Sequence, residues 1–143
     1  MSEEIRKIAS ALYGQAFDAY EAGDNPLWAI ELAATSLNLW RQIGSDQNLA
    51  IGCWLYSRTL LQGGAVDLAL VAIRNSLTHL DAIDEPADWL VASCLEGYAR
   101  ALNAAGVAEA IEAMEQAAAA IDAIADPEDR ALIASQFADL RRA

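Results

Sequence analysis

The sequence predicts an all-α protein built from antiparallel helical hairpins. Three observations lead to this fold class. Glycine and proline interrupt the chain of 143 residues at regular intervals. The segments between them carry apolar residues at helical spacing, and no segment alternates with period two as a half-buried strand would. The segments also repeat, with an offset of 40 to 42 residues.

The first four helices are bounded by these interruptions. In the first segment, Ile5, Ile8 and Leu12 form an apolar stripe that runs up to Gly23. The second helix begins at Pro26, where a first-turn proline loses no hydrogen bond within the helix. A glycine follows the second helix, and a pair of glycines follows the third. The predicted ranges are 3–22, 26–43, 46–62 and 66–83.

The last three helices follow the same rules. Pro86 and Pro127 are expected in the first turns of the fifth and seventh helices. Acidic residues crowd the first turns of the sixth and seventh, as at Glu109 and Glu128, where the helix dipole favours negative charge. The predicted ranges are 86–105, 107–125 and 127–142. Because the loops are short, neighbouring helices are expected to pack antiparallel.

The repeat is visible as an alignment of small and apolar residues in the second helix of each hairpin. Another small residue follows each aligned alanine after seven positions, and Leu or Ala comes directly after it. An isoleucine is expected at the end of each of these helices. The aligned triplets are Ala29, Ala69 and Ala110, then Ser36, Ser76 and Ala117, then Ile43, Ile83 and Ile124. Small residues at these positions let helices approach closely, which favours stacked hairpins over an irregular bundle.

This spacing resembles the tetratricopeptide repeat (TPR). Gly64, Ala69, Ser76 and Leu77 match that pattern, and the other two hairpins match it within one residue. The period exceeds the usual 34 residues of the family, and most of its first-helix signature is absent. The resemblance implies one domain over residues 1–143, folded as a right-handed α-α superhelix. Its parts are hairpins at about 3–43, 46–83 and 86–125 and a terminal helix at 127–142.

The acidic character of the chain limits the kinds of molecule that it is expected to bind. The formal net charge of -12 repels phosphate backbones and anionic headgroups, so neither nucleic acid nor a membrane is the expected partner. The N-terminal sequence has no apolar run of the kind found in signal peptides, so a cytoplasmic location is expected.

No residue pattern predicts catalysis, a metal site or a cofactor. The single histidine, His79, has no Glu three residues before it and is expected on the solvated surface. Cys53 and Cys94 are not spaced as metal ligands and are expected to be reduced and buried, although a redox pair is conceivable because stacked repeats would bring them close. The chain is therefore predicted not to be an enzyme.

The first helices of the hairpins are expected to line a concave groove that binds a protein or peptide partner. On the first helix, Lys7, Gln15 and Asp18 form the matching stripe, with Tyr13 at its edge. The candidate binding residues on the third and fifth helices are Trp54, Arg58, Gln62, Trp89, Glu96, Arg100 and Asn103.

Two interpretations of these groove residues stay open. Arg58 and Arg100 are equivalent by the repeat and would stand side by side. They form either a target for a carboxylate or ion pairs with groove acids such as Glu96. Trp54 and Trp89 either contact a partner or belong to the core.

The last helix has no following helix to pair with, and its apolar residues exceed what a solvated face needs. It is expected either to cap the superhelix or to form a homodimer contact. The alternative function is accordingly a structural or homo-oligomerising repeat protein without an exchangeable ligand.

Overall fold

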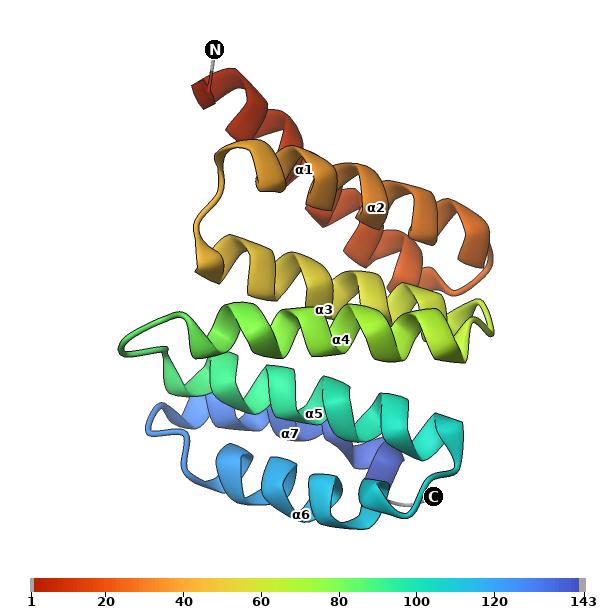
Figure 1. Cartoon of the computed structure of the whole chain (residues 1–143), viewed down its shortest axis with the longest axis vertical. Helices are drawn as coiled ribbons and strands as arrows, with labels where there is room; N and C mark the ends of the chain where they lie inside the picture. Colours follow the sequence, from red (N-terminus) through yellow and green to blue (C-terminus); the bar gives the residue numbers. More distant parts are fainter. Residues whose placement is uncertain (1, 142–143) are drawn as a thin grey trace.

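A computed structural model describes residues 2–141, which form seven α-helices connected by short loops. The helices stack along the long axis of the molecule, with the first hairpin at one end and the sixth and seventh helices at the other (Figure 1). Their bounds are α1 (Ser2–Ala22), α2 (Pro26–Ile43), α3 (Asp46–Gln62), α4 (Val66–Asp81), α5 (Asp88–Ala105), α6 (Glu109–Asp122) and α7 (Pro127–Arg141).

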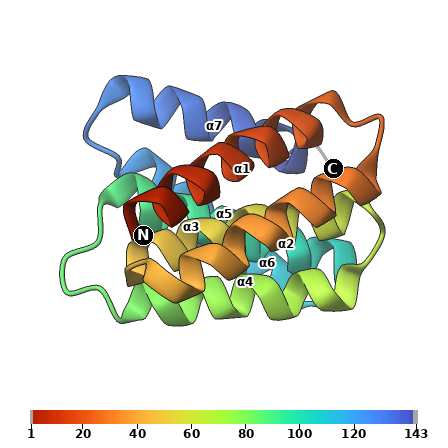
Figure 2. The same cartoon turned by 90° about the horizontal axis from the view of Figure 1, so that it is seen from above.

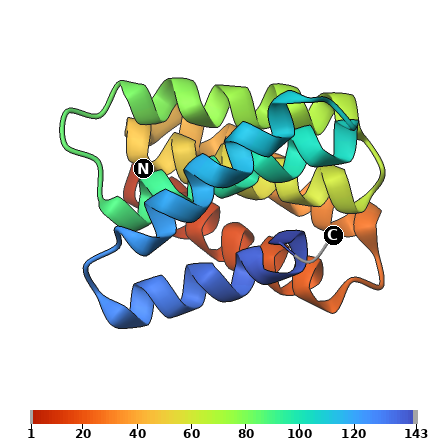
Figure 3. The same cartoon turned by 90° about the horizontal axis from the view of Figure 1, so that it is seen from below.

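The helices form two rows. Helices α1, α3, α5 and α7 lie on one side and are called the inner row, and α2, α4 and α6 form the outer row (Figure 2). The view from the opposite end shows the same separation, with α4 and α7 on opposite sides (Figure 3). Because successive helices are antiparallel, all members of the inner row point the same way. No helix of the described residues combines the length and the apolar character needed to cross a membrane.

The small residues of the repeat connect the two helices of a hairpin. The buried Ser36 hydroxyl of α2 donates a hydrogen bond of 2.7 Å to the main-chain oxygen of Ala9 on α1. The equivalent Ser76 of α4 donates one of 2.7 Å to Ala50 on α3. In the third hairpin this position is Ala117, which has no hydroxyl but is fully buried. The close helix approach predicted from these positions is therefore confirmed.

The turns inside the hairpins also follow the repeat. Gly64 and Gly106, which the alignment makes equivalent, have φ angles of 84° and 70°. A side chain at such a left-handed position would clash with the backbone, so glycine suits both turns.

Four predicted helix bounds are wrong by two residues or more, including the start of α6, which begins at Glu109 rather than at residue 107. Pro86 lies before α5 rather than in its first turn, because the backbone of Ala87 is still extended, with ψ 142°. Helices α4 and α6 end at Asp81 and Asp122, so Ile83 and Ile124 lie beyond the helices that they were expected to close. Ile124 instead turns into the core, where it is fully buried. The predicted end of the last helix, residue 142, lies outside the described residues.

Candidate functional site

The inner row forms a groove with a floor and two walls. Helices α3 and α5 pack side by side and form the floor, while α1 and α7 stand at its two edges. Among the described residues, no Cα atom of α1 lies within 8 Å of one in α7, so the groove is open between its walls. Figure 2 shows both walls on the same side of the molecule. The groove runs along the helices rather than across them.

An apolar cavity of about 230 Å³ occupies the half of the groove near the N-terminal ends of the inner helices. We call it the aromatic cavity, because four aromatic side chains line it. All four inner helices contribute. The lining residues are Tyr13 and Phe17 of α1, Ile51 and Trp54 of α3, Trp89, Leu90 and Ser93 of α5, and Asp129, Leu132, Ile133 and Gln136 of α7.

Trp54 stands at the centre of the floor and is 7 % exposed. The Phe17 ring stacks on it with centroids 6.4 Å apart, and the Arg58 guanidinium lies over it at 5.4 Å. Burial raises the pKa of Tyr13, which lines the same cavity. Aromatic side chains from α1 and α3 thus enclose one side of the cavity.

A second pocket of about 370 Å³ occupies the other half of the groove. We call it the polar pocket, because two arginines, an aspartate and two amides line it. Its residues are Tyr20, Arg58, Leu61, Gln62, Arg100, Asn103, Ala104, Asp139 and Leu140.

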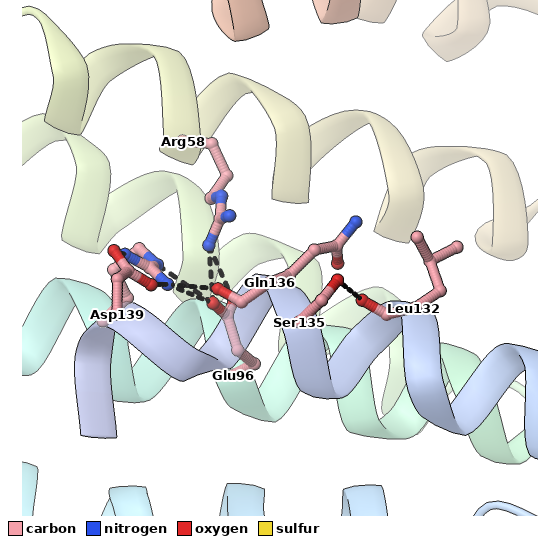
Figure 4. A network of polar contacts seen from close by, with 7 residues as sticks. Arg58, Glu96, Leu132, Ser135, Gln136 and Asp139 are labelled. Carbon is pink, nitrogen blue, oxygen red and sulfur yellow. Dashed lines mark hydrogen bonds and ion pairs between the residues drawn. The ribbon is translucent and has the colours of Figure 1, made fainter. Parts of the chain in front are cut away.

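A network of charges centred on Glu96 borders the polar pocket, since Arg58 and Arg100 belong to both (Figure 4). The carboxylate is 1 % exposed and accepts two hydrogen bonds from Arg58 Nη1, at 2.6 and 3.0 Å. It also accepts bonds from Arg100 Nε and Nη2, at 2.9 and 2.8 Å. A carboxylate removed from water requires such compensation, and two guanidinium groups supply it.

Arg100 extends the network to α7. Its Nη1 and Nη2 atoms donate to the two Asp139 carboxylate oxygens, at 2.9 and 2.8 Å, and Nη2 also donates to the main-chain oxygen of Gln136 at 2.7 Å. The hydrogen bond from Arg100 lowers the pKa of Asp139 to about 2. The network therefore joins α3, α5 and α7 and fixes the last helix against the groove floor.

Comparison with known proteins points to one fold. A TPR-like protein from Chlorobium tepidum, known from a crystal structure, superimposes with a TM-score of 0.75 at 16 % sequence identity. The match covers 97 % of this chain and 98 % of that one. The fold is TPR-like. No protein-family model and no curated protein matches the chain.

The TPR-like fold confirms the predicted fold class, an all-α superhelix of helical hairpins. The resemblance to the TPR family is confirmed at the level of the fold. The chain thus has a helical-repeat fold, and α7 continues its inner row as the last helix packed against α5 and α6.

The TPR-like groove brings the predicted site residues together, but several lie deeper than predicted. Trp54 and Trp89 line the aromatic cavity, while Arg58, Gln62, Arg100 and Asn103 line the polar pocket. Glu96 lies beneath the pocket, and Trp54, Arg58 and Glu96 are buried rather than exposed along a surface stripe. The reason is that α1 and α7 cover them: Arg58 lies 5.5 Å from the Tyr20 ring centroid, and α7 supplies Asp139.

Of the two interpretations of the arginine pair, the structure shows the internal one. Arg58 and Arg100 converge on the same carboxylate of Glu96 rather than presenting two free guanidinium groups. For Trp54 the core alternative is confirmed, and because the residue also lines a cavity its contact with a partner stays a prediction.

The walls supply residues that the sequence did not single out. The expected stripe of α1 is wrong, because Lys7, Gln15 and Asp18 are exposed and line neither half of the groove. The α1 wall consists instead of Phe17 and Tyr20 together with Tyr13, which was expected at the edge of the stripe. The α7 wall consists of Asp129, Leu132, Ile133, Gln136, Asp139 and Leu140. The spacing of Tyr13, Phe17 and Tyr20, at i, i+4 and i+7, marks one face of a helix and could have identified the α1 wall.

The remaining titratable candidates lie outside the groove. Cys53 and Cys94 are free thiols and buried, as predicted, and burial raises the pKa of Cys94 to about 11. His79 was expected on the solvated surface but is half-buried, with Nδ1 3.0 Å from the Asp46 carboxylate. Within the described residues, no group of three His, Cys, Asp or Glu side chains could hold a metal ion.

Proposed function

We propose that this scaffold binds a segment of another protein in the groove between α1 and α7, and that it does so without catalysing a reaction. The observation that supports this most is the aromatic cavity, which is mostly apolar, only partly closed, and built by all four inner helices. Binding sites combine such apolar walls with a few polar groups that fix orientation.

The charged groups of the groove support binding rather than chemistry. Arg58, Arg100, Glu96 and Asp139 neutralise one another in a fixed network. General acid–base catalysis needs groups poised to gain or lose a proton near neutral pH, whereas Asp139 is held as a carboxylate with a pKa of about 2. The net charge of -12 further favours a protein partner over nucleic acid or an anionic membrane.

A pair of matched variants tests the proposal. Leu132 is 58 % exposed and lines the aromatic cavity, so Leu132→Lys places a charge at its mouth without disturbing the core. Ile111→Lys is the control, since Ile111 is 70 % exposed on α6 of the outer row. We expect proteins captured from native lysate by the wild type to be lost with Leu132→Lys and retained with Ile111→Lys, at unchanged melting temperatures.

Two results would overturn this function. Capture of the same proteins by Leu132→Lys would show that the groove is not the binding surface. A stable dimer in sedimentation equilibrium that Leu132→Lys dissociates would show that a second copy covers the groove. The chain would then be the homo-oligomerising repeat protein of the alternative interpretation.

A further inference from the structure

The aromatic cavity has the size of a side-chain site. Its volume of about 230 Å³ falls below the roughly 300 to 1,000 Å³ of pockets that enclose drug-sized ligands. It is also open to solvent along the groove between α1 and α7. These properties suit a single bulky side chain that enters from a chain lying in the groove.

The floor of the cavity favours an aromatic occupant. The faces of the Trp54 indole are engaged by the Phe17 ring and the Arg58 guanidinium. Its Cδ1 side faces α5, where a Cβ added at Gly97 would lie 3.0 Å away. The indole also lines the cavity, so the part of the ring that these contacts leave free faces an occupant. An aromatic edge carries partial positive charge and attracts the face of another ring.

The rim of the cavity favours a cation beside that ring. Asp129 lines the cavity from the first turn of α7, and its carboxylate makes no ion pair within the described residues. The two arginines of the groove are already bound to Glu96. The unpaired charge at the mouth is thus negative, in a chain whose net charge is -12.

The same rim can bind a peptide main chain. The Tyr13 and Ser93 hydroxyls and the Gln136 side-chain amide line the cavity, and none of them makes a hydrogen bond to another described residue. Figure 4 shows the Gln136 amide turned away from the network that its main-chain oxygen joins. These groups offer both donors and acceptors to an incoming chain.

We propose that the aromatic cavity binds an aromatic side chain of a partner segment that carries lysine or arginine next to it, with the cation placed at Asp129. This inference rests on the proposed function and specifies the chemistry of its partner. The segment differs from an acidic peptide, which the unpaired Asp129 and the overall charge repel.

Synthetic peptides test the chemistry directly. The probe is a capped heptapeptide with one central phenylalanine flanked by lysines, and binding is measured by titration calorimetry. Three matched peptides replace the phenylalanine by alanine, the phenylalanine by cyclohexylalanine, or the lysines by glutamates. We expect saturable binding of the probe and at least a tenfold loss with alanine. The cyclohexyl ring should bind roughly two- to tenfold more weakly, because it has the bulk but not the aromatic face.

Two variants of α7 test the place of the cation. Asp129→Asn and Glu128→Gln each remove one negative charge from adjacent residues, but only Asp129 lines the cavity. We expect Asp129→Asn to weaken the lysine peptide about two- to fivefold, the range for a partly solvated ion pair, and to reduce its salt dependence. Glu128→Gln should leave the affinity for the lysine peptide and its salt dependence unchanged.

Three outcomes would overturn the inference: no saturable binding of the lysine peptide at millimolar concentration, equal or tighter binding of the glutamate peptide, or equal effects of the two α7 variants. None of these bears on whether Leu132→Lys abolishes capture from lysate. A failure of the partner chemistry is therefore distinguishable from a failure of the proposed function.

Discussion

Replacing Glu96 by glutamine is the sharpest test of what holds the groove together. The substitution keeps the size of the side chain and one acceptor oxygen, but removes the charge on which two arginines converge. Arg58, which is 6 % exposed, then remains buried without a counterion. Removing one partner of a buried ion pair costs about 3–5 kcal/mol. Because glutamine still accepts a hydrogen bond, we expect a loss near the lower end, about 3 kcal/mol.

Such a loss is large against a typical total stability of about 5–15 kcal/mol. For a chain of this length it corresponds to a fall in melting temperature of roughly 10 °C. Chemical denaturation of Glu96→Gln measures it, with the exposed Glu31→Gln on α2 as control, which should change the free energy of unfolding by no more than about 0.5 kcal/mol. Adding Arg58→Met should restore much of the loss, because the unpaired cation is gone. A Glu96→Gln variant as stable as the control would refute the reasoning.

Three further substitutions probe the stability of the fold. The folded-state pKa of Asp139, about 2, lies below its ordinary value of 3.8. Its ionised form therefore stabilises the fold above 3.8, and this stabilisation is lost as the pH falls through that interval toward 2. Asp139→Asn should reduce the pH dependence of the denaturation midpoint over this interval. An unchanged pH dependence would contradict the role of Arg100. At Gly97, an added Cβ would lie 2.7 Å from Ile73 Cδ1 in a full core, so Gly97→Ala should cost about 1–2 kcal/mol. Gly14→Ala, with no atom within 4 Å of the new Cβ, should instead stabilise the fold by about 0.5–1 kcal/mol. If thermal unfolding shows that the two substitutions change stability in the same direction, packing at Gly97 is not limiting.

Short sequence patterns predicted the fold, and they succeed for features that depend on neighbouring residues in the chain. Glycine and proline mark the ends of most helices, and the equivalence of Ser36 and Ser76 anticipates two hydrogen bonds of equal length between paired helices. The early end of α6 was missed because the core draws Ile124 inward, which no propensity of the preceding residues shows.

The depth of the site could not be predicted, because it depends on distant parts of the chain. A helical wheel of α3 places Arg58 on the non-core side, and only the approach of α1 and α5 makes it a buried residue. Its partner Glu96 is 38 positions away, and Asp139 is 39 positions from Arg100. Spacing within one helix does not show how far neighbouring helices cover a residue, so the depth of these residues appears only in three dimensions.

The separation of α1 from α7 has a mechanical consequence. Because no Cα atom of α1 lies within 8 Å of one in α7 among the described residues, the width of the groove is set by how the intervening helices pack, including the interfaces of α2 with α3 and of α4 with α5. Small rotations at these interfaces add up along the superhelix. A slight change at any one interface therefore widens or narrows the groove between α1 and α7. A ligand that touches both walls would bridge them and stiffen the whole superhelix, including the outer-row helices α2, α4 and α6, which line neither half of the groove.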